Sequence, residues 1–424
     1  MITKLKRILY SRKLLLSAFL LACFVVAGCA PAGITVPRGW SGGVVADGTL
    51  FIGAMDGKIV ALNTTDGKRL WEVPLEDSVV AIYGSPTVAG DLVYLGGYHS
   101  GKMYAFAQDK IRWVYPRDRA FVDSTGKIAQ IIGGAIIAQG KVFFGVDNGV
   151  VYALDAMTGD YVWEFPTGGK IWSTPAISGD TLFVGSFDKK LYALDTATGN
   201  ERWTFETQGA IVATPLVHDN TVYIGSFDRK LYAVDVTTGQ EKWRFLEAKN
   251  WFWAKPLAKD NTIYASNLDG KGYALDARSG DKLVEFDLGS PVSASPVLVG
   301  NRVIVATENG AVYAIDAENK ESNKLRDPLQ TKDIKVYAPL TTDGVVVYMH
   351  TSDGKLYAFD AVDGSELNWS PISLKQAAVP PPSSQQSSQQ SSGQGMNWGS
   401  IIALFASGIV LVLVFQRLFK RRGS

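Results

Sequence analysis

Residues 171–205 carry the pattern that decides the fold, and they read IWSTPAISGDTLFVGSFDKKLYALDTATGNERWTF. Residues 211–245 repeat them closely as IVATPLVHDNTVYIGSFDRKLYAVDVTTGQEKWRF. Each copy holds four short apolar runs separated by Gly, Asp and Asn, which is the pattern of strands joined by hairpin turns. Aligned on the tyrosine of Tyr-Ala-Leu-Asp, eight copies follow at intervals of 40 to 48 residues, at Val60, Tyr104, Tyr152, Tyr192, Tyr232, Tyr273, Tyr313 and Tyr357. Four-stranded units of about 40 residues are typical of propeller blades. The sequence therefore predicts an all-β, eight-bladed propeller over residues 36–374.

An aspartate, a glycine and a tryptophan recur at fixed positions in several repeats. An aspartate opens the turn after the third strand and a glycine ends it, as in the pairs Asp155 and Gly159, Asp195 and Gly199, and Asp235 and Gly239. The carboxylate can accept backbone N–H bonds within the turn, and glycine supplies the positive φ. A tryptophan follows four residues after the glycine, at Trp71, Trp163, Trp203 and Trp243. Since one tryptophan can bury roughly 150–250 Å², we expect these side chains to pack between blades rather than to act in catalysis.

The net charge of +1 hides an uneven distribution. Residues 1–29 and 397–424 hold nine of the 42 basic residues and no acidic one, so the rest of the chain has 33 basic and 41 acidic residues. A body with a charge of about −8 excludes a strongly basic nucleic-acid-binding protein. A hydrophobic content of 46% excludes disorder throughout the chain.

The N-terminus has the features of an export signal. Basic residues precede an apolar stretch from Leu14 to Ala27, as in a secretory signal. Val26-Ala27-Gly28-Cys29 resembles the lipobox of bacterial lipoproteins. This resemblance implies a signal peptide over residues 1–28, lipidation of Cys29 and a lipid-anchored segment over residues 29–35. The alternative is an uncleaved signal anchor in which the cysteine is incidental.

The C-terminus predicts a second membrane attachment. Residues 375–396 are rich in Pro, Ser and Gln, which indicates a disordered tether. Residues 397–416 contain no charged side chain, and about 20 residues suffice for a transmembrane helix. Residues 417–424 are basic, so we expect a cytoplasmic tail and a propeller on the extracytoplasmic side of the cell membrane.

The repeat Tyr-Ala-Leu-Asp-x-x-Thr-Gly-x-x-x-Trp resembles that of the PQQ-like propeller superfamily. This superfamily contains quinoprotein alcohol dehydrogenases and non-catalytic lipoproteins of the BamB type, which act as scaffolds in outer-membrane barrel assembly. The resemblance implies that an enzyme would use PQQ, a disulfide of adjacent cysteines, Ca²⁺ and an aspartate. This chain has no cysteine after Cys29, and His99, His218 and His350 lie in different blades without metal spacing, as ordinary surface or loop residues.

These observations predict a non-catalytic scaffold without cofactor or metal, which binds protein partners of the cell envelope and no nucleic acid. A PQQ- or sugar-binding redox module stays the alternative. The predicted spanning helix departs from BamB-type proteins, which are anchored by lipid alone, and it favours the cytoplasmic membrane over the outer membrane.

A partner site is predicted at the channel-lining strands. Three residues before the Pro, or its Gly equivalent, the blades carry Trp40, Tyr83, Ile131, Trp172, Val212, Trp253, Ser293 and Val336. Blade 6 also has an unusual aromatic and basic run, Trp251-Phe252-Trp253-Ala254-Lys255. Amphipathic aromatics with a cation are typical of interface residues. The candidate partner-binding residues are Trp40, Tyr83, Trp172, Trp251, Phe252, Trp253 and Lys255. The alternative is that these side chains fill the channel or pack between blades.

Overall fold

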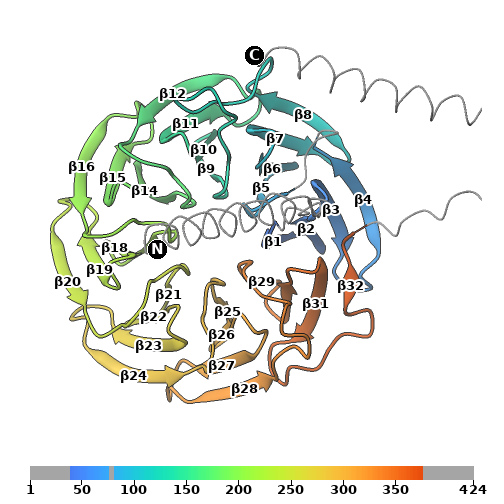
Figure 1. Cartoon of the computed structure of the whole chain (residues 1–424), viewed down its shortest axis with the longest axis vertical. Coiled ribbons are helices and arrows are strands. Elements are labelled where there is room, and N and C mark those ends of the chain that lie inside the picture. The colour runs from blue at the N-terminus through green and yellow to red at the C-terminus, as the bar shows by residue number, and fades with distance from the viewer. Residues whose placement is uncertain (1–38, 76–80, 376–424) are drawn as a thin grey trace, which may run out of the picture. The chain divides into compact units, whose positions relative to one another are not determined.

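A computed structural model describes residues 39–75 and 81–375, which form eight four-stranded antiparallel sheets arranged as the blades of a ring (Figure 1). The predicted eight-bladed, all-β fold is confirmed. The predicted signal peptide, Cys29, the tether, the spanning helix and the basic tail lie outside the described residues. Within the described ranges, no helix is long and apolar enough to cross a membrane.

The blades follow one another in chain order. Blades 1 to 4 comprise β1 (Gly43–Ala46), β2 (Thr49–Gly53), β3 (Lys58–Asn63) and β4 (Arg69–Pro74); β5 (Thr87–Ala89), β6 (Leu92–Gly97), β7 (Lys102–Ala107) and β8 (Lys110–Tyr115); β9 (Ile136–Ala138), β10 (Lys141–Gly145), β11 (Val150–Asp155) and β12 (Tyr161–Pro166); and β13 (Ala176–Ser178), β14 (Thr181–Gly185), β15 (Lys190–Asp195) and β16 (Glu201–Glu206). Blades 5 to 8 comprise β17 (Leu216–His218), β18 (Thr221–Gly225), β19 (Leu231–Asp235) and β20 (Glu241–Phe245); β21 (Leu257–Lys259), β22 (Thr262–Ser266), β23 (Lys271–Asp276) and β24 (Lys282–Asp287); β25 (Val297–Val299), β26 (Arg302–Ala306), β27 (Val312–Asp316) and β28 (Ser322–Arg326); and β29 (Thr341–Thr342), β30 (Val346–His350), β31 (Lys355–Asp360) and β32 (Ile372–Ser373).

Each blade runs outward from the ring axis. Its first strand lies beside the first strand of the next blade, and its fourth strand forms the outer edge (Figure 1). Because the strands alternate in direction, the turn between the second and third strands lies on the same face of the ring as the connection to the next blade. The segment that precedes each first strand therefore enters the channel from this face.

Apolar side chains fill the space between neighbouring blades. Phe143 and Val151 of blade 3 belong to one buried cluster with Leu182 and Val184 of blade 4, and the same pairing recurs around the ring. The second strand ends in a glycine in several blades, because an isoleucine of the next blade occupies the adjoining space. A Cβ added at Gly185 would lie only 2.4 Å from Ile211 Cγ2.

The repeated tryptophans also join neighbouring blades. Trp163 Nε1 donates a hydrogen bond to the Thr196 carbonyl of the next blade at 3.1 Å. Its ring covers Gly199, which has a φ of 76° and where a Cβ would lie 2.7 Å from Trp163 Cδ2. Trp113, Trp203 and Trp243 repeat both contacts. Trp71 is half-buried beside Phe51, with ring centroids 5.7 Å apart.

The repeated aspartates organise the turns that these tryptophans cover. Asp195 Oδ1 accepts hydrogen bonds from the backbone N–H groups of Ala197 and Thr198, at 3.0 and 2.9 Å. The Arg202 guanidinium bonds to the same carboxylate, and with the turn N–H groups it holds the pKa of Asp195 well below its usual range. Asp155 and Asp235 bond their own turns in the same way.

The ring closes between blades 8 and 1 through a different set of side chains. His350 ends β30, where other blades have Gly, Ser or Ala, and Gly39 stands where the next blade usually has an isoleucine or another large apolar residue. His350 is only 3% exposed, so its interpretation as a surface or loop residue is wrong. Its Nδ1 lies 2.9 Å from the carbonyl oxygen of Ser41, and burial lowers its pKa. At the closing interface the large residue, His350, thus ends the second strand and the small residue, Gly39, lies on the next blade, which is the reverse of the other interfaces.

Candidate functional site: the aromatic mouth of the channel

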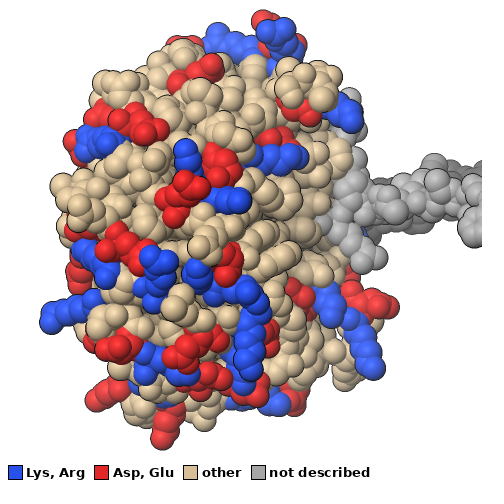
Figure 2. Space-filling model, turned by 60° about the vertical axis from the view of Figure 1, so that its left-hand side comes forward, with Lys and Arg blue, Asp and Glu red and all other residues tan. Residues whose placement is uncertain are grey.

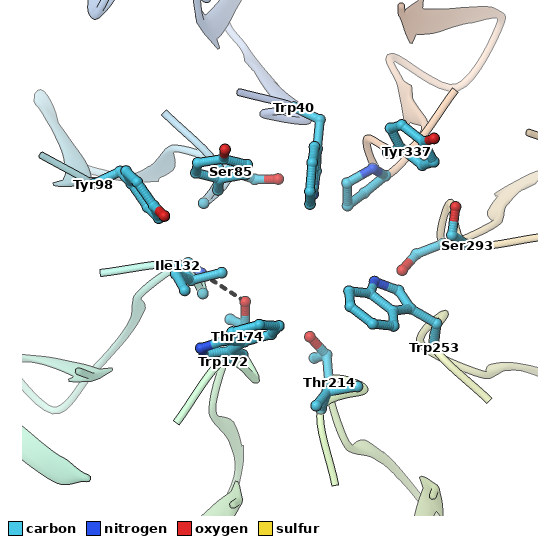
Figure 3. Close-up of a pocket in the computed structure, with 17 residues that line it drawn as sticks. Trp40, Ser85, Tyr98, Ile132, Trp172, Thr174, Thr214, Trp253, Ser293 and Tyr337 are labelled. Carbon is cyan, nitrogen blue, oxygen red and sulfur yellow. Dashed lines mark hydrogen bonds between the residues drawn. The ribbon is translucent and has the colours of Figure 1, made fainter. Parts of the chain in front are cut away.

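A cavity of about 210 Å³ opens at the end of the channel where the first strands begin, and residues from all eight blades line it (Figure 3). We call this opening the mouth. Its first ring takes one residue from each blade, just before the first strand begins: Trp40, Tyr83, Ile132, Trp172, Val212, Trp253, Ser293 and Tyr337. All eight line the cavity, and five of them are large aromatics.

Two of the eight channel-lining residues predicted from the sequence are wrong by one position. Ile131 and Val336 are fully buried between blades, while their neighbours Ile132 and Tyr337 line the cavity. The one-residue error has a large effect because consecutive side chains of an extended segment point to opposite sides. The mouth thus gains an aromatic residue, Tyr337, that the sequence alignment missed.

The aromatic side chains form two groups on opposite sides of the mouth. The first group comes from blades 8, 1 and 2, where Trp40 lies 4.5 Å from Tyr83 and 5.2 Å from Tyr337 between ring centroids. Tyr98 extends this group at 4.6 Å from Tyr83. Figure 3 shows these residues facing Trp172 and Trp253 across the cavity.

The second group comes from blades 4, 5 and 6. Trp172 packs edge-on against Phe187 at 4.6 Å, and Phe227 stacks on both Trp251 and Trp253 at 4.4 and 5.5 Å. Trp251 remains 43% exposed beside the mouth. Stacked rings of this kind present a rigid apolar surface at little cost in conformational entropy.

Phe252 does not belong to this surface, although the sequence predicted it there. Its side chain is 1% exposed and lies against Gly225 of the neighbouring blade, where other blades place an isoleucine. It therefore packs between blades, which is the alternative that the sequence left open. Lys255 comes two residues after Trp253, and burial lowers its pKa.

Sequence reasoning missed Tyr98, Phe187 and Phe227, which come from a different part of the repeat. Each stands two residues after the second-strand glycine that contacts the next blade, as Phe187 follows Gly185 and Tyr98 follows Gly96. Five other blades have Met55, Asp147, Leu268, Glu308 and Ser352 at this position. Reading the eight copies column by column at this turn would have found the aromatic members.

The lining is poor in groups for catalysis. Its polar side-chain groups are the hydroxyls of Ser, Thr and Tyr and the indole N–H groups of Trp, and Thr174 Oγ1 already accepts the backbone N–H of Gly134 at 2.7 Å. Across residues 39–75 and 81–375, no group of three His, Cys, Asp or Glu side chains could hold a metal ion. The lining has no carboxylate for Ca²⁺ and no cysteine, so it does not fit the quinone site that the superfamily resemblance implies for an enzyme.

The charged surface lies elsewhere. Figure 2 shows basic and acidic side chains intermingled over the visible rim, without a large area of one sign. Many of them pair, as Arg202 does with Asp180 and Asp195 at 2.7 and 2.6 Å. The mouth is therefore distinguished from this rim by its aromatic lining.

Comparison with known proteins bears on this arrangement. The family model described as "Outer membrane protein assembly factor BamB" matches residues 30–146 and 147–370. The chain belongs to this family. A BamB protein of Shewanella oneidensis is 32% identical to this BamB-family propeller over 171 residues, which are 37% of this chain and 38% of that protein.

Other similarities are more distant. The lupanine 17-hydroxylase [cytochrome c] of a Pseudomonas species is 30% identical over 142 residues, 29% of this chain and 20% of that enzyme. The matches to these two curated relatives thus span well under half of each. The crystal structure of BamB from Moraxella catarrhalis superposes with a TM-score of 0.61 at 23% identity, covering 75% of this BamB-family chain and 93% of that one. At this identity the likeness supports the shared fold.

Proposed function

We propose that this protein is a non-catalytic scaffold of the cell envelope that binds protein partners at the mouth of its channel. The family match and the relatives named for outer membrane protein assembly support a role in the assembly of exported or membrane proteins. The predicted lipid anchor and spanning helix would hold the propeller on the extracytoplasmic side of a membrane.

The observation that carries this proposal is the pair of aromatic groups at the mouth. Tryptophan and tyrosine are enriched among the residues that dominate binding energy at protein interfaces. Here Trp40, Trp172, Trp253 and Tyr337 converge on one opening, while a stacked and half-exposed Trp251 extends the surface beside it. A cavity of about 210 Å³ is smaller than typical small-molecule sites of about 300–1,000 Å³. It suits a side chain of a partner better than a whole cofactor.

Photocrosslinking in intact cells tests the proposal. A photoreactive residue is placed at Trp172 or at Trp253, and a control is placed at Met157, which is exposed in a turn on the opposite face. We expect the two mouth positions to trap the same envelope protein and the control to trap none of it. Equal trapping from Met157, with no product specific to the mouth, would argue against the proposal.

A ligand-binding module is the second candidate, because part of the chain is similar to the protein named lupanine 17-hydroxylase [cytochrome c]. Calorimetry of the purified protein with PQQ and Ca²⁺ separates the two candidates. Micromolar or tighter binding of PQQ would favour the module, and the scaffold predicts no measurable heat beyond dilution.

A further inference from the structure

Below the aromatic ring, the channel has a second ring with one exceptional residue. Each blade contributes the residue two positions after its first-ring residue: Gly42, Ser85, Gly134, Thr174, Thr214, Lys255, Ser295 and Pro339. Six of these eight line the cavity, and the two that do not, Gly42 and Lys255, occupy the equivalent positions of blades 1 and 6. Seven are small or uncharged, so Lys255 is the single charged residue of the sixteen in the two rings.

Lys255 is held at the channel wall without a counter-ion. Its backbone N–H donates to Ser295 Oγ of the next blade at 3.0 Å, and Ser295 lines the cavity. Within the described ranges its ammonium group has no ion pair, whereas Lys170 near the mouth pairs with Asp147. The residue is exposed, and its equivalents in six other blades line the cavity.

The surroundings of Lys255 favour an anion. Desolvation lowers the pKa of its ammonium group, although the residue is exposed. An unpaired and partly desolvated cation gains more from a bound carboxylate than a fully solvated lysine does. The charge on the channel wall is therefore complementary to a negatively charged ligand.

The spacing of the two rings defines the shape of that ligand. Trp253 and Lys255 are two residues apart, so their Cα atoms are separated by at most about 7 Å. An extended peptide has the same spacing between residues i and i+2. A peptide that enters from the mouth with its C-terminal end leading would thus meet the aromatic groups with one residue and Lys255 with the second residue after it.

We propose that the mouth binds an extended peptide segment in which an aromatic residue is followed two positions later by Asp or Glu. The aromatic ring packs between the two aromatic groups, and the carboxylate pairs with Lys255 Nζ. This inference rests on the proposed scaffold function and adds the chemistry of the segment that the scaffold binds.

Paired peptides test it. The full-length protein, purified in detergent, is titrated with acetyl-Gly-Phe-Gly-Asp-Gly-amide and with its Asn twin, using fluorescence anisotropy of a labelled form. We expect the Asp peptide to bind about tenfold more tightly, as for one charge-assisted hydrogen bond. Lys255→Gln should remove this preference by lowering the affinity for the Asp peptide to that for its Asn twin. Lys249→Gln, at an exposed lysine outside the two rings, is the matched control.

Three outcomes would overturn the inference: no binding of either peptide, equal binding of both, or a preference that Lys255→Gln leaves intact. None of them removes the scaffold proposal if the photocrosslinks form at Trp172 and Trp253. Loss of those crosslinks would remove the scaffold proposal by itself.

Discussion

Two of the blade-joining tryptophans make a matched pair that isolates the value of one hydrogen bond. Trp163 and Trp243 are 6% and 8% exposed, and each packs against one ring of its own blade, Phe143 or Tyr223, at 5.7 Å. Each indole donates to a carbonyl of the next blade, at 3.1 and 3.0 Å. Replacement of either by Phe therefore removes a similar amount of buried apolar surface and one hydrogen bond.

The two carbonyl acceptors differ. The Ala277 oxygen also accepts the Tyr223 hydroxyl at 3.0 Å, so it keeps a donor in Trp243→Phe. The Thr196 oxygen has Trp163 as its donor and lies on a fully buried residue, so Trp163→Phe leaves it unpaired. An unpaired buried acceptor costs about 1–3 kcal/mol. We expect Trp163→Phe to lower the free energy of unfolding by about 1–3 kcal/mol more than Trp243→Phe.

Equilibrium unfolding in urea, followed by circular dichroism, measures both variants, and an unchanged m-value shows that the comparison is valid. The double variant Tyr223→Phe/Trp243→Phe removes both donors to the Ala277 oxygen. It should lose more stability than the sum of its single variants, because the oxygen is unpaired only when both donors are absent. Equal losses for the two tryptophan variants, or an additive double variant, would refute this reasoning.

Three further predictions concern the repeat and its closure. Burial lowers the pKa of His350, so below pH about 6.5 the unfolded chain binds more protons than the folded protein does. The free energy of unfolding should therefore fall as the pH is lowered from about 6.5 to 5, by at most about 1.4 kcal/mol per pH unit. Asp353 and Lys375 act on this pKa in opposite directions, and thermal unfolding of His350→Leu should not show this dependence on pH. The turn aspartates have lowered pKa values, so the stability that they contribute is present above pH about 4 and is lost as the pH falls further. In an acid titration, Asp235→Asn should therefore lose less unfolding free energy than the parent protein does. Gly199→Ala should cost at least about 1 kcal/mol in urea unfolding, because the residue has positive φ and its Cβ would meet the Trp163 ring, whereas Gly179→Ala, also at positive φ but with open space around it, should cost less.

The fold could be predicted from the sequence because the same turn and packing residues recur at the same spacing in several blades. Asp195, Gly199 and Trp203 recur at fixed offsets, and their contacts in the structure explain those offsets: carboxylate to turn, glycine under indole, and indole to the next blade. In blade 8 the tryptophan, Trp369, stands five residues after the turn glycine Gly364 instead of four, and the neighbouring copies still indicate what it does. Trp369 covers Gly67 of blade 1 and so continues the contact across the closing interface.

The mouth was predicted only in part because it depends on register within irregular segments. In blades 3 and 8 the proline used for alignment is replaced or displaced, and an error of one residue exchanged Ile132 for Ile131 and Tyr337 for Val336. The burial of Phe252 could not be predicted from its neighbours Trp251 and Trp253, because an aromatic residue fits the same space between blades that isoleucine fills elsewhere. His350 was missed because its role depends on Gly39, about 310 residues away in the chain.

The aromatic mouth is the partner-binding surface in the function that we propose. The most direct test is the affinity of the purified full-length protein for the partner trapped from Trp172 and Trp253, measured with Trp172→Ala, Trp253→Ala and the opposite-face control Met157→Ala. Central aromatic residues of an interface each contribute about 2 kcal/mol or more, which corresponds to a loss of about 30-fold in affinity. We predict a loss of that size for each tryptophan variant and a change of less than about twofold for the control. Wild-type affinity in both tryptophan variants, with the fold intact, would contradict the claim.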